Sequence, residues 1–405
     1  MKKIATLILG ITAIAFLITG TPLNAETVRI TRPVEGITNI TLATYGNLVI
    51  TQGNKNELTI KTSKKEEKNL VCKKEGDTLI LRTKNTHWIF FGLLGNSSDV
   101  TYYLTLKNID SIINKGTGNI TTESNINSKN LKLKVLGDGN IDLANICASN
   151  IDLVNSGTGT FKADSVIVNN KANIKLSGDG NIDLQKTNAS KMDLVNSGTG
   201  TFNAASLKVD RKTNIELSGD GNINLHNINA LNISNIINKG TGTITAKGSI
   251  NSENLKLHLD GDGNINLPNL SVQNIDLVNS GTGNFNAEYV KVDNKANLKI
   301  LGDGDIHIDN LDSNSLKNEI VGSGSIKISG GSGKTQNTSV KASGNYTAPN
   351  FKTERADIDL TGSGDITVNV AKSISISAAG SGDLKVIGKP TVKSITSSGS
   401  GSVKF

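Results

Sequence analysis

Pairs of glycines separated by a single residue recur along most of the chain at an almost constant interval. The first glycine of each Gly-x-Gly falls every 20 or 21 residues from Gly116 to Gly322, and the interval continues less strictly to Gly399. A sustained period of this length is typical of a solenoid, in which each repeat buries its apolar side chains only against its neighbours. Aromatic residues make up only 3% of the chain, which argues against a compact core of large side chains.

Apolar residues within each repeat stand two positions apart, which is the period of a β-strand rather than of a helix. The repeats that begin at Gly137 and Gly261 show this most clearly, with the pairs Ile141/Leu143, Ile146/Ala148, Ile151/Leu153, Ile265/Leu267, Leu270/Val272 and Ile275/Leu277. Three short inward-facing strands per coil, separated by polar corners, predict an all-β fold. We expect a three-sided, right-handed parallel β-helix with about 20–21 residues per coil and about 15 coils, because connections between parallel strands are overwhelmingly right-handed.

The first 25 residues have the pattern of a signal peptide. Lys2 and Lys3 form a basic start, residues 4–20 are almost entirely apolar, and Ala25 is a small residue at the expected cleavage site. No later segment is apolar enough to cross a membrane, so we expect no transmembrane segment after signal removal. The sequence therefore predicts an exported protein of the periplasm, the cell surface or the surrounding medium.

The mature chain divides into three predicted regions. Residues 26–110 alternate as longer strands outside the glycine interval and are expected to form an N-terminal β-strand cap. Residues 111–322 are expected to form a regular β-helix with a 41-residue double repeat, and residues 323–405 less regular Gly/Ser-rich coils.

The most apolar stretch of the mature chain interrupts the expected cap. It contains the large side chains of Trp88, Ile89, Phe90, Phe91, Leu93 and Leu94. The open end of a solenoid exposes unpaired strand edges, so one interpretation is that this stretch covers that end. The alternative is an exposed loop that contacts a partner or a lipid surface.

The order of several segments carries a family resemblance. GNLVITQGNKNELTIKTSKKEEKNLVCKKEGDTLILRTKN is followed by DVTYYLTLKNIDSIINKGTGNI, by recurring G-x-G-[ND]-[IF] and by the final GSGSVKF. In this order the chain resembles the head GIN domain family of auto-transporter adhesins, from about Ile37 to Phe405. The resemblance implies a right-handed β-helix, an exported location and an adhesive role, and it implies no catalytic or binding residues.

The residue between the two glycines alternates between threonine and aspartate. We call this column the polar ladder; it comprises Thr117, Asp138, Thr158, Asp179, Thr199, Asp220, Thr241, Asp262, Thr282 and Asp303. Aspartates in adjacent coils would place like charges opposite one another, and the interposed threonines double their separation. The glycines are expected to permit a positive φ or a close backbone approach at the corner.

The asparagines that follow many of these corners are expected to form a second column. They are Asn119, Asn140, Asn181, Asn222 and Asn264. Stacked asparagines can hydrogen-bond from one strand to the next, so we expect hydrogen-bonded ladders along the stack.

Two ligand-loop interpretations of the glycine motifs fit less well. Calcium-binding solenoids use nine-residue Gly-Gly-x-Gly-x-Asp turns, whereas here the interval is 20–21 residues and the second aspartate comes one position late. The segment from Gly330 to Thr335 resembles the end of a phosphate-binding loop, but Ile328 stands where that motif requires glycine. We interpret this segment as a flexible Gly/Ser corner.

Catalysis and metal binding are not favoured by the pattern of acidic and histidine residues. Ladder aspartates two coils apart would be separated by about 9.6 Å, near the limit of about 9.5 Å for an inverting glycosidase pair. Five equivalent carboxylates nevertheless form a pattern rather than a local exception. His226, His258 and His307 fall at different offsets from the glycines and do not form one column. We expect no enzyme activity, no catalytic residues, no metal site and no cofactor.

The basic charge of the chain is not concentrated in a way that indicates nucleic-acid binding. Residues 26–110 carry 12 basic and 9 acidic side chains, residues 111–321 carry 19 and 22, and residues 322–405 carry 10 and 5. Cys147 is expected to point outward and Cys72 inward, leaving two free thiols.

The function predicted from the sequence is that of a surface or envelope adhesin, an exported solenoid that presents its polar face to an extracellular or envelope ligand, either a protein or a glycan. The alternatives are a polysaccharide-active β-helix enzyme and a purely structural periplasmic protein.

Overall fold

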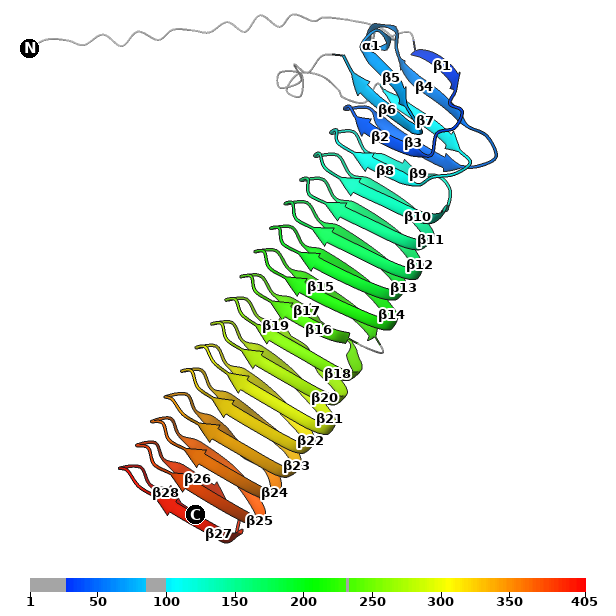
Figure 1. Cartoon of the computed structure of the whole chain (residues 1–405). Coiled ribbons are helices and arrows are strands. Elements are labelled where there is room, and N and C mark those ends of the chain that lie inside the picture. The colour runs from blue at the N-terminus through cyan, green and yellow to red at the C-terminus, as the bar shows by residue number, and fades with distance from the viewer. Residues whose placement is uncertain (1–26, 85–99, 231–232) are drawn as a thin grey trace, which may run out of the picture.

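The computed structural model describes residues 27–84, 100–230 and 233–405. The predicted signal peptide and the apolar stretch from Trp88 to Leu94 lie outside the described residues. The described residues form a parallel β-solenoid of about 15 turns that is preceded by an antiparallel β region (Figure 1). The predicted fold class is therefore confirmed, while the right hand of the helix stays a prediction.

The antiparallel region lies at one end of the rod (Figure 1). Its elements are β1 (Thr27–Pro33), β4 (Glu57–Ser63), α1 (Lys64–Glu67), β5 (Leu70–Glu75), β6 (Thr78–Thr83) and β7 (Thr101–Leu106). β4 pairs antiparallel with β1 and with β7, and β5 pairs antiparallel with β6. α1 has four residues, and no helix in the described part of the chain is long and apolar enough to cross a membrane.

Parallel stacking begins before the glycine interval does. β2 (Asn39–Ala43) and β3 (Asn47–Gln52) pair in parallel with β8 (Ser111–Asn114) and β9 (Ile120–Thr122), respectively. The segment between β3 and β8 contains β4 to β7 and the residues outside the described part. β2 and β3 therefore have the arrangement of a coil, although only one glycine marks the corner between them.

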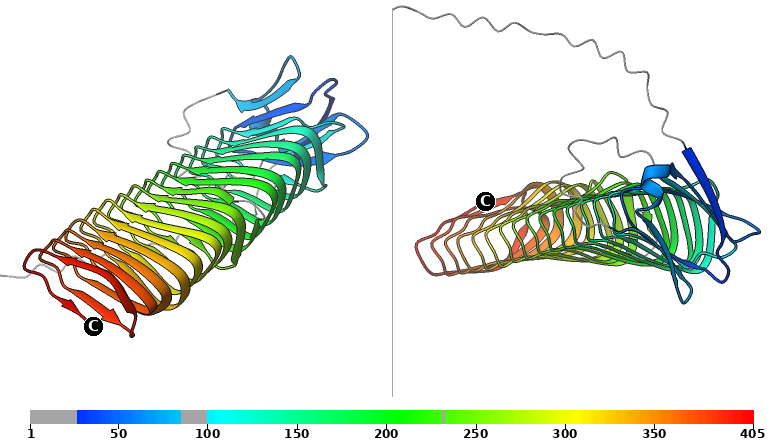
Figure 2. Two further views of the ribbon diagram at one scale, coloured as in Figure 1. Left: turned by 60° about the horizontal axis from the view of Figure 1, so that its bottom comes forward. Right: turned by 90° about the horizontal axis from the view of Figure 1, so that it is seen from above.

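The coils that follow are stacked one on another along the rod (Figures 1 and 2). Their strands are β10 (Ile126–Val135), β11 (Ile141–Asn155), β12 (Phe161–Leu176), β13 (Ile182–Asn196), β14 (Phe202–Leu217), β15 (Ile223–Ala230), β16 (Ile233–Asn238), β17 (Ile244–Ala246), β18 (Ser249–Leu259), β19 (Ile265–Asn266), β20 (Asn269–Asn279), β21 (Phe285–Ile300), β22 (Ile306–Ile320), β23 (Ile326–Val340), β24 (Tyr346–Leu360), β25 (Ile366–Ala378), β26 (Leu384–Ile387), β27 (Thr391–Ser397) and β28 (Val403–Lys404).

The parallel register places equivalent residues of successive coils above one another. Ile141, Phe161, Ile182 and Phe202 form one such column, and all four side chains are buried. The inward pairs predicted in the repeats from Gly137 and Gly261 are all buried. The predicted division into three short strands is incomplete, because in most coils one long strand continues through two corners and ends only at the glycine corner. A shift in the pairing register of adjacent strands, such as the one after Ala148 in the pairing of β11 with β12, marks a corner through which the strand continues.

Close backbone approach explains the paired glycines. A Cβ atom added to Gly157 would lie 2.2 Å from the carbonyl oxygen of Gly137, and one added to Gly180 would lie 2.0 Å from that of Gly159. Neither glycine is among those of the described chain that have positive φ. Of the two reasons expected for glycine at these corners, the structure supports tight stacking of one corner on the next.

Both cysteines are free and half-buried. Cys72 packs against the core, as expected, and burial raises the pKa of its thiol. Cys147 lies at an outward position of β11, between the buried Ile146 and Ala148.

Candidate functional site

The polar ladder lies at the glycine corners, where each corner stacks directly on the one before it. Backbone hydrogen bonds join these corners, as from the Gly159 amide to the Gly137 carbonyl at 3.1 Å. Four threonine hydroxyls donate to the aspartate of the preceding coil. The pairs are Thr158–Asp138 and Thr199–Asp179 at 2.6 Å, and Thr241–Asp220 and Thr282–Asp262 at 2.7 Å. The threonines therefore separate the carboxylates and also hydrogen-bond to them.

The asparagine column beside the polar ladder is hydrogen-bonded as expected, although backbone amides of the next coil, and not neighbouring side chains, donate to the asparagine oxygens. The Asn140 side-chain oxygen accepts from the Thr160 amide at 2.7 Å, and Asn181 accepts from Thr201 at 2.8 Å. Asn119, Asn222 and Asn264 accept in the same way from the amides of Asn140, Thr243 and Asn284. Asn140, Asn181, Asn222 and Asn264 therefore join each Gly-Asp-Gly corner to the following Gly-Thr-Gly corner, and Asn119 joins its own corner to that of Asn140.

A set of fully buried asparagines, which the sequence reasoning missed, lies inside the same corners. Its members are Asn114, Asn155, Asn196, Asn238 and Asn279. The Asn196 side-chain amide donates to the Gly200 carbonyl at 2.9 Å and to the Asn222 carbonyl at 3.1 Å. Its side-chain oxygen accepts from the Gly198 amide at 3.2 Å. Each of the other four makes the equivalent three contacts.

The buried asparagines and the polar ladder connect alternate coil interfaces. Asn155 joins the corner of Thr158 to the following aspartate corner through the carbonyl of Asn181. On the outer surface, Thr158 joins the same corner to the preceding one through Asp138. The buried asparagine therefore connects a Gly-Thr-Gly corner to the following Gly-Asp-Gly corner, and the threonine hydroxyl connects it to the preceding one. This alternation gives the double repeat of 41 residues a structural cause.

The sequence contains a signal for these asparagines. Each stands two positions before the first glycine of a Gly-Thr-Gly corner. In the intervening Gly-Asp-Gly corners the same position is occupied by Val135, Leu176, Leu217, Leu259 and Ile300, all buried. A polar residue that alternates with aliphatic ones at a single inward position predicts a buried amide with a defined hydrogen-bonding partner.

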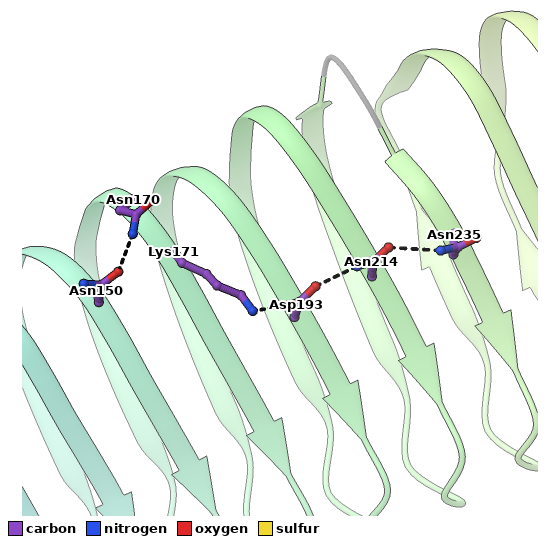
Figure 3. A network of polar contacts seen from close by, with 6 residues as sticks. All are labelled: Asn150, Asn170, Lys171, Asp193, Asn214 and Asn235. Atoms are coloured by element: carbon purple, nitrogen blue, oxygen red, sulfur yellow. Dashed lines mark hydrogen bonds and ion pairs between the residues drawn. The ribbon is translucent and has the colours of Figure 1, made fainter.

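Other outward positions also form polar connections between coils. Figure 3 shows one of them, in which Lys171 pairs with Asp193 at 2.7 Å and Asp193 accepts from Asn214 at 2.7 Å. Asn214 in turn accepts from Asn235 at 3.1 Å. Partial burial raises the pKa of Asp193, but the hydrogen bonds from Lys171 and Asn214 outweigh it, so the net pKa is lowered.

The described residues contain no group of three or more histidine, cysteine, aspartate or glutamate side chains placed to hold a metal ion. His307 contacts the carboxylate of Asp309 at 2.9 Å. The segment from Gly330 to Thr335, interpreted as a flexible Gly/Ser corner, lies within strand β23 and pairs in parallel with β22, so it is part of the sheet rather than a flexible loop.

Shallow hollows lie on the described surface, and two of them contain charged side chains. One, of about 430 Å³, lies over β21 to β25 and includes Asp312, Ser332 and Lys352. The other, of about 520 Å³, lies over β13 to β18 and includes Lys186, Lys208 and Asn229. Both are open grooves on the side of the rod.

Stacked coils, inward aliphatic columns and outward polar columns define the chain as a β-solenoid with a repetitive polar exterior. The family model described as "Putative auto-transporter adhesin, head GIN domain" matches residues 37–228, 226–293 and 287–390. The chain belongs to this family, as its resemblance predicts. Three successive matches are in keeping with the large number of coils.

Several solved structures are similar to this chain. A "putative adhesin" from Bacteroides fragilis is 15% identical, with 75% of this chain and 97% of that chain covered and a TM-score of 0.33. A "putative lipid binding protein" from Parabacteroides distasonis is 17% identical over the same shares, with a TM-score of 0.38. A "putative adhesin" from Parabacteroides merdae is 13% identical, again over 75% and 97%, with a TM-score of 0.33. Comparison with curated proteins gives no match.

Proposed function

We propose that the mature protein is an exported, non-catalytic adhesin that binds an extracellular or envelope ligand through the outward columns of its solenoid. The family to which the chain belongs supports an adhesive role. The amino-terminal pattern of residues 1–25 supports export.

The observation that carries this proposal is the repetition of outward polar side chains from coil to coil. Asp142, Lys162, Asp183, Asn203 and Asn224 occupy equivalent outward positions in five successive coils. Such a column offers a polar group about every 4.8 Å. A ligand that itself repeats, such as a glycan chain or a fibrous protein, can then contact several coils at once and gain affinity from their number.

The test is binding of the purified mature chain to intact cells and to arrays of glycans and extracellular proteins. The proposal predicts saturable binding to at least one such surface, and a shortened variant with fewer coils is expected to bind more weakly. Absence of saturable binding to all of them would contradict the adhesive role. Incubation with a polysaccharide panel is expected to release no new reducing ends or unsaturated products, and their appearance would contradict the non-catalytic role.

A structural role in the envelope is the second candidate. It is favoured by the hydrogen bonds within the polar ladder, because Thr158, Thr199, Thr241 and Thr282 direct their hydroxyl groups to neighbouring coils rather than to solvent. Under this alternative, deletion of the protein weakens the envelope and leaves attachment to surfaces unchanged.

A further inference from the structure

We propose that the groove that includes Ser332 and Gly333 of the glycine-rich segment Gly330–Gly333 binds a neutral oligosaccharide. Tyr289, which hydrogen-bonds to Asp312 of the groove, supplies an aromatic surface beside it. This inference rests on the proposed adhesive function and assigns that function a ligand class and a place. The segment is the one whose sequence resembles the end of a phosphate-binding loop.

Strand β23 lacks an outward side chain at Gly330, beside the groove. Gly330 and Gly331 lie in register with Asn310 and Leu311 of β22. A Cβ atom on Gly330 would lie 2.8 Å from the side-chain oxygen of Asn310. Gly331 has a φ of +110°, and its Cβ would lie 2.0 Å from the carbonyl oxygen of Leu311. Gly330 shares the outward register of the exposed Asn310, whereas Gly331 shares the inward register of the buried Leu311. Only Gly330 therefore removes a side chain from the outer surface of this coil.

The interior compensates for the missing side chains. Phe351 of β24 is in register with Gly331 and is fully buried. A Cβ atom on Gly333 would lie 2.9 Å from the Cζ atom of Phe351, so the phenylalanine ring already occupies the inward space. The groove is therefore supported from below by a packed core, which favours a preformed shape.

The floor of the groove is polar and crosses several coils. Lys291, Asp312, Ser332 and Lys352 are in register on β21, β22, β23 and β24. Four strands at about 4.8 Å spacing extend over roughly 14 Å, enough for a short oligosaccharide rather than one sugar.

The charges around the groove balance. Its charged residues are Lys291, Lys334, Lys352, Asp293, Asp312 and Glu354. Three cations and three anions favour a ligand without net charge over a phosphate or a sulfated chain, because an anionic ligand would face three carboxylates.

Tyr289 and Asp312 form the specific part of the proposed site. The Tyr289 hydroxyl donates to the Oδ2 atom of Asp312 at 3.0 Å, and the Ser332 hydroxyl donates to Oδ1 at 3.0 Å. These bonds fix the carboxylate, whose oxygens retain further acceptor capacity for ligand hydroxyl groups. Tyr289 is 40% exposed, whereas Phe161, Phe202 and Phe285 of the described coils are fully buried.

An exposed ring beside fixed hydrogen-bonding groups matches the two surfaces of a pyranose. The apolar C–H face of the sugar can lie against the ring, and its hydroxyl groups can reach the carboxylate, the hydroxyl group and the lysines. A neutral glycan therefore fits these groups better than an apolar peptide, which would leave them unpaired.

The test uses the mature chain and neutral hexasaccharides of glucose, mannose, galactose and N-acetylglucosamine, with binding measured by calorimetry and saturation-transfer NMR. At least one hexasaccharide is expected to bind. Tyr289→Ala is expected to weaken binding at least about tenfold, and Tyr289→Phe, which keeps the ring, to weaken it less. Asp312→Asn should also weaken binding. Asn229→Ala in the other groove is the matched control and is expected to leave binding unchanged.

Circular dichroism of each variant establishes that it is folded. Binding of no hexasaccharide, binding only of a sulfated hexasaccharide, or equal binding by Tyr289→Ala and the unaltered chain would each overturn the inference. If the unaltered chain still binds cells or extracellular proteins saturably, the adhesive function stands and only this site is wrong. If it binds none of them, the proposed function fails as well.

Discussion

Replacement of a buried asparagine tests whether the inner hydrogen bonds hold the glycine corners together. Asn196 is fully buried and accepts from the Gly198 amide while donating to the Gly200 carbonyl. In Asn196→Ala these two backbone groups lose their side-chain partner inside the solenoid. An unsatisfied buried group costs about 1–3 kcal/mol, so the free energy of unfolding is expected to fall by roughly 2–6 kcal/mol.

A second variant separates hydrogen bonding from packing. Leu176 and Leu217 occupy the equivalent position in the two adjacent coils, so a leucine is compatible with this column. Asn196→Leu restores the side-chain volume without the hydrogen bonds and is expected to remain less stable than the unaltered chain by at least about 1 kcal/mol. Asn170→Ala, which removes one exposed hydrogen bond to Asn150, is the control and should change stability by less than about 0.5 kcal/mol.

The assay combines equilibrium unfolding in guanidinium chloride with hydrogen exchange. Because a solenoid can unfold in parts, exchange is followed on the peptide that contains residues 196–202, where the weakened corner should open more often. If Asn196→Leu has the same stability and exchange as the unaltered chain, the reasoning is refuted, and volume alone explains the buried column.

Three further predictions address other parts of the fold. Thr199→Val removes the exposed hydrogen bond to Asp179. It is expected to lower the free energy of unfolding, measured in guanidinium chloride, by less than about 1 kcal/mol. A decrease as large as that of Asn196→Ala would contradict the division between inner and outer connections. Gly180→Ala places a Cβ atom 2.0 Å from the Gly159 carbonyl oxygen and is expected to lower the free energy of unfolding by more than about 2 kcal/mol. Ser177→Ala, beside the corner, is the control and should leave stability nearly unchanged. A Gly180→Ala protein as stable as the unaltered chain would show that the corners can separate. For Glu319, burial raises the pKa, but Lys299 at 3.3 Å and Lys341 at 3.7 Å outweigh it and lower the net value. Its stabilising contribution is therefore present above the ordinary pKa of about 4.5 and is lost as the pH falls through the lower folded-state pKa. Glu319→Gln should reduce the loss of stability between pH 5 and pH 3, measured by guanidinium unfolding, and an unchanged pH profile would contradict the assignment.

The fold could be predicted because its physical causes are local and repeated. Alternation of apolar residues gives the inward positions, and the interval between glycines gives the length of a coil. Ile141, Leu143 and their equivalents are buried for that reason. The early start of the stack at β2 could not be predicted, because only Gly46 marks that corner and a long antiparallel insertion separates β3 from β8.

The site could be predicted only in part. The alternation of threonine with aspartate identifies the polar ladder and indicates charge repulsion, but it does not reveal the hydrogen bond from Thr158 to Asp138. The buried asparagines were missed because asparagine is common at the surface of this chain, although their alternation with aliphatic residues at one inward position is a signal in the sequence. The groove beside Tyr289 depends on contacts between adjacent coils, such as the hydrogen bond from Tyr289 to Asp312, which stands 23 residues later in the chain. No local pattern contains such a contact.

Exposure of the chain on living cells tests the central claim, a surface adhesin, most directly. Intact cells that produce the protein are treated with a protease that cannot enter them, and the chain is then detected with antibodies to its coils. The account predicts that the coils are cleaved on intact cells and that the treated cells attach less well to their target surface. Coils that stay protected until the envelope is opened, together with unchanged attachment, would contradict it.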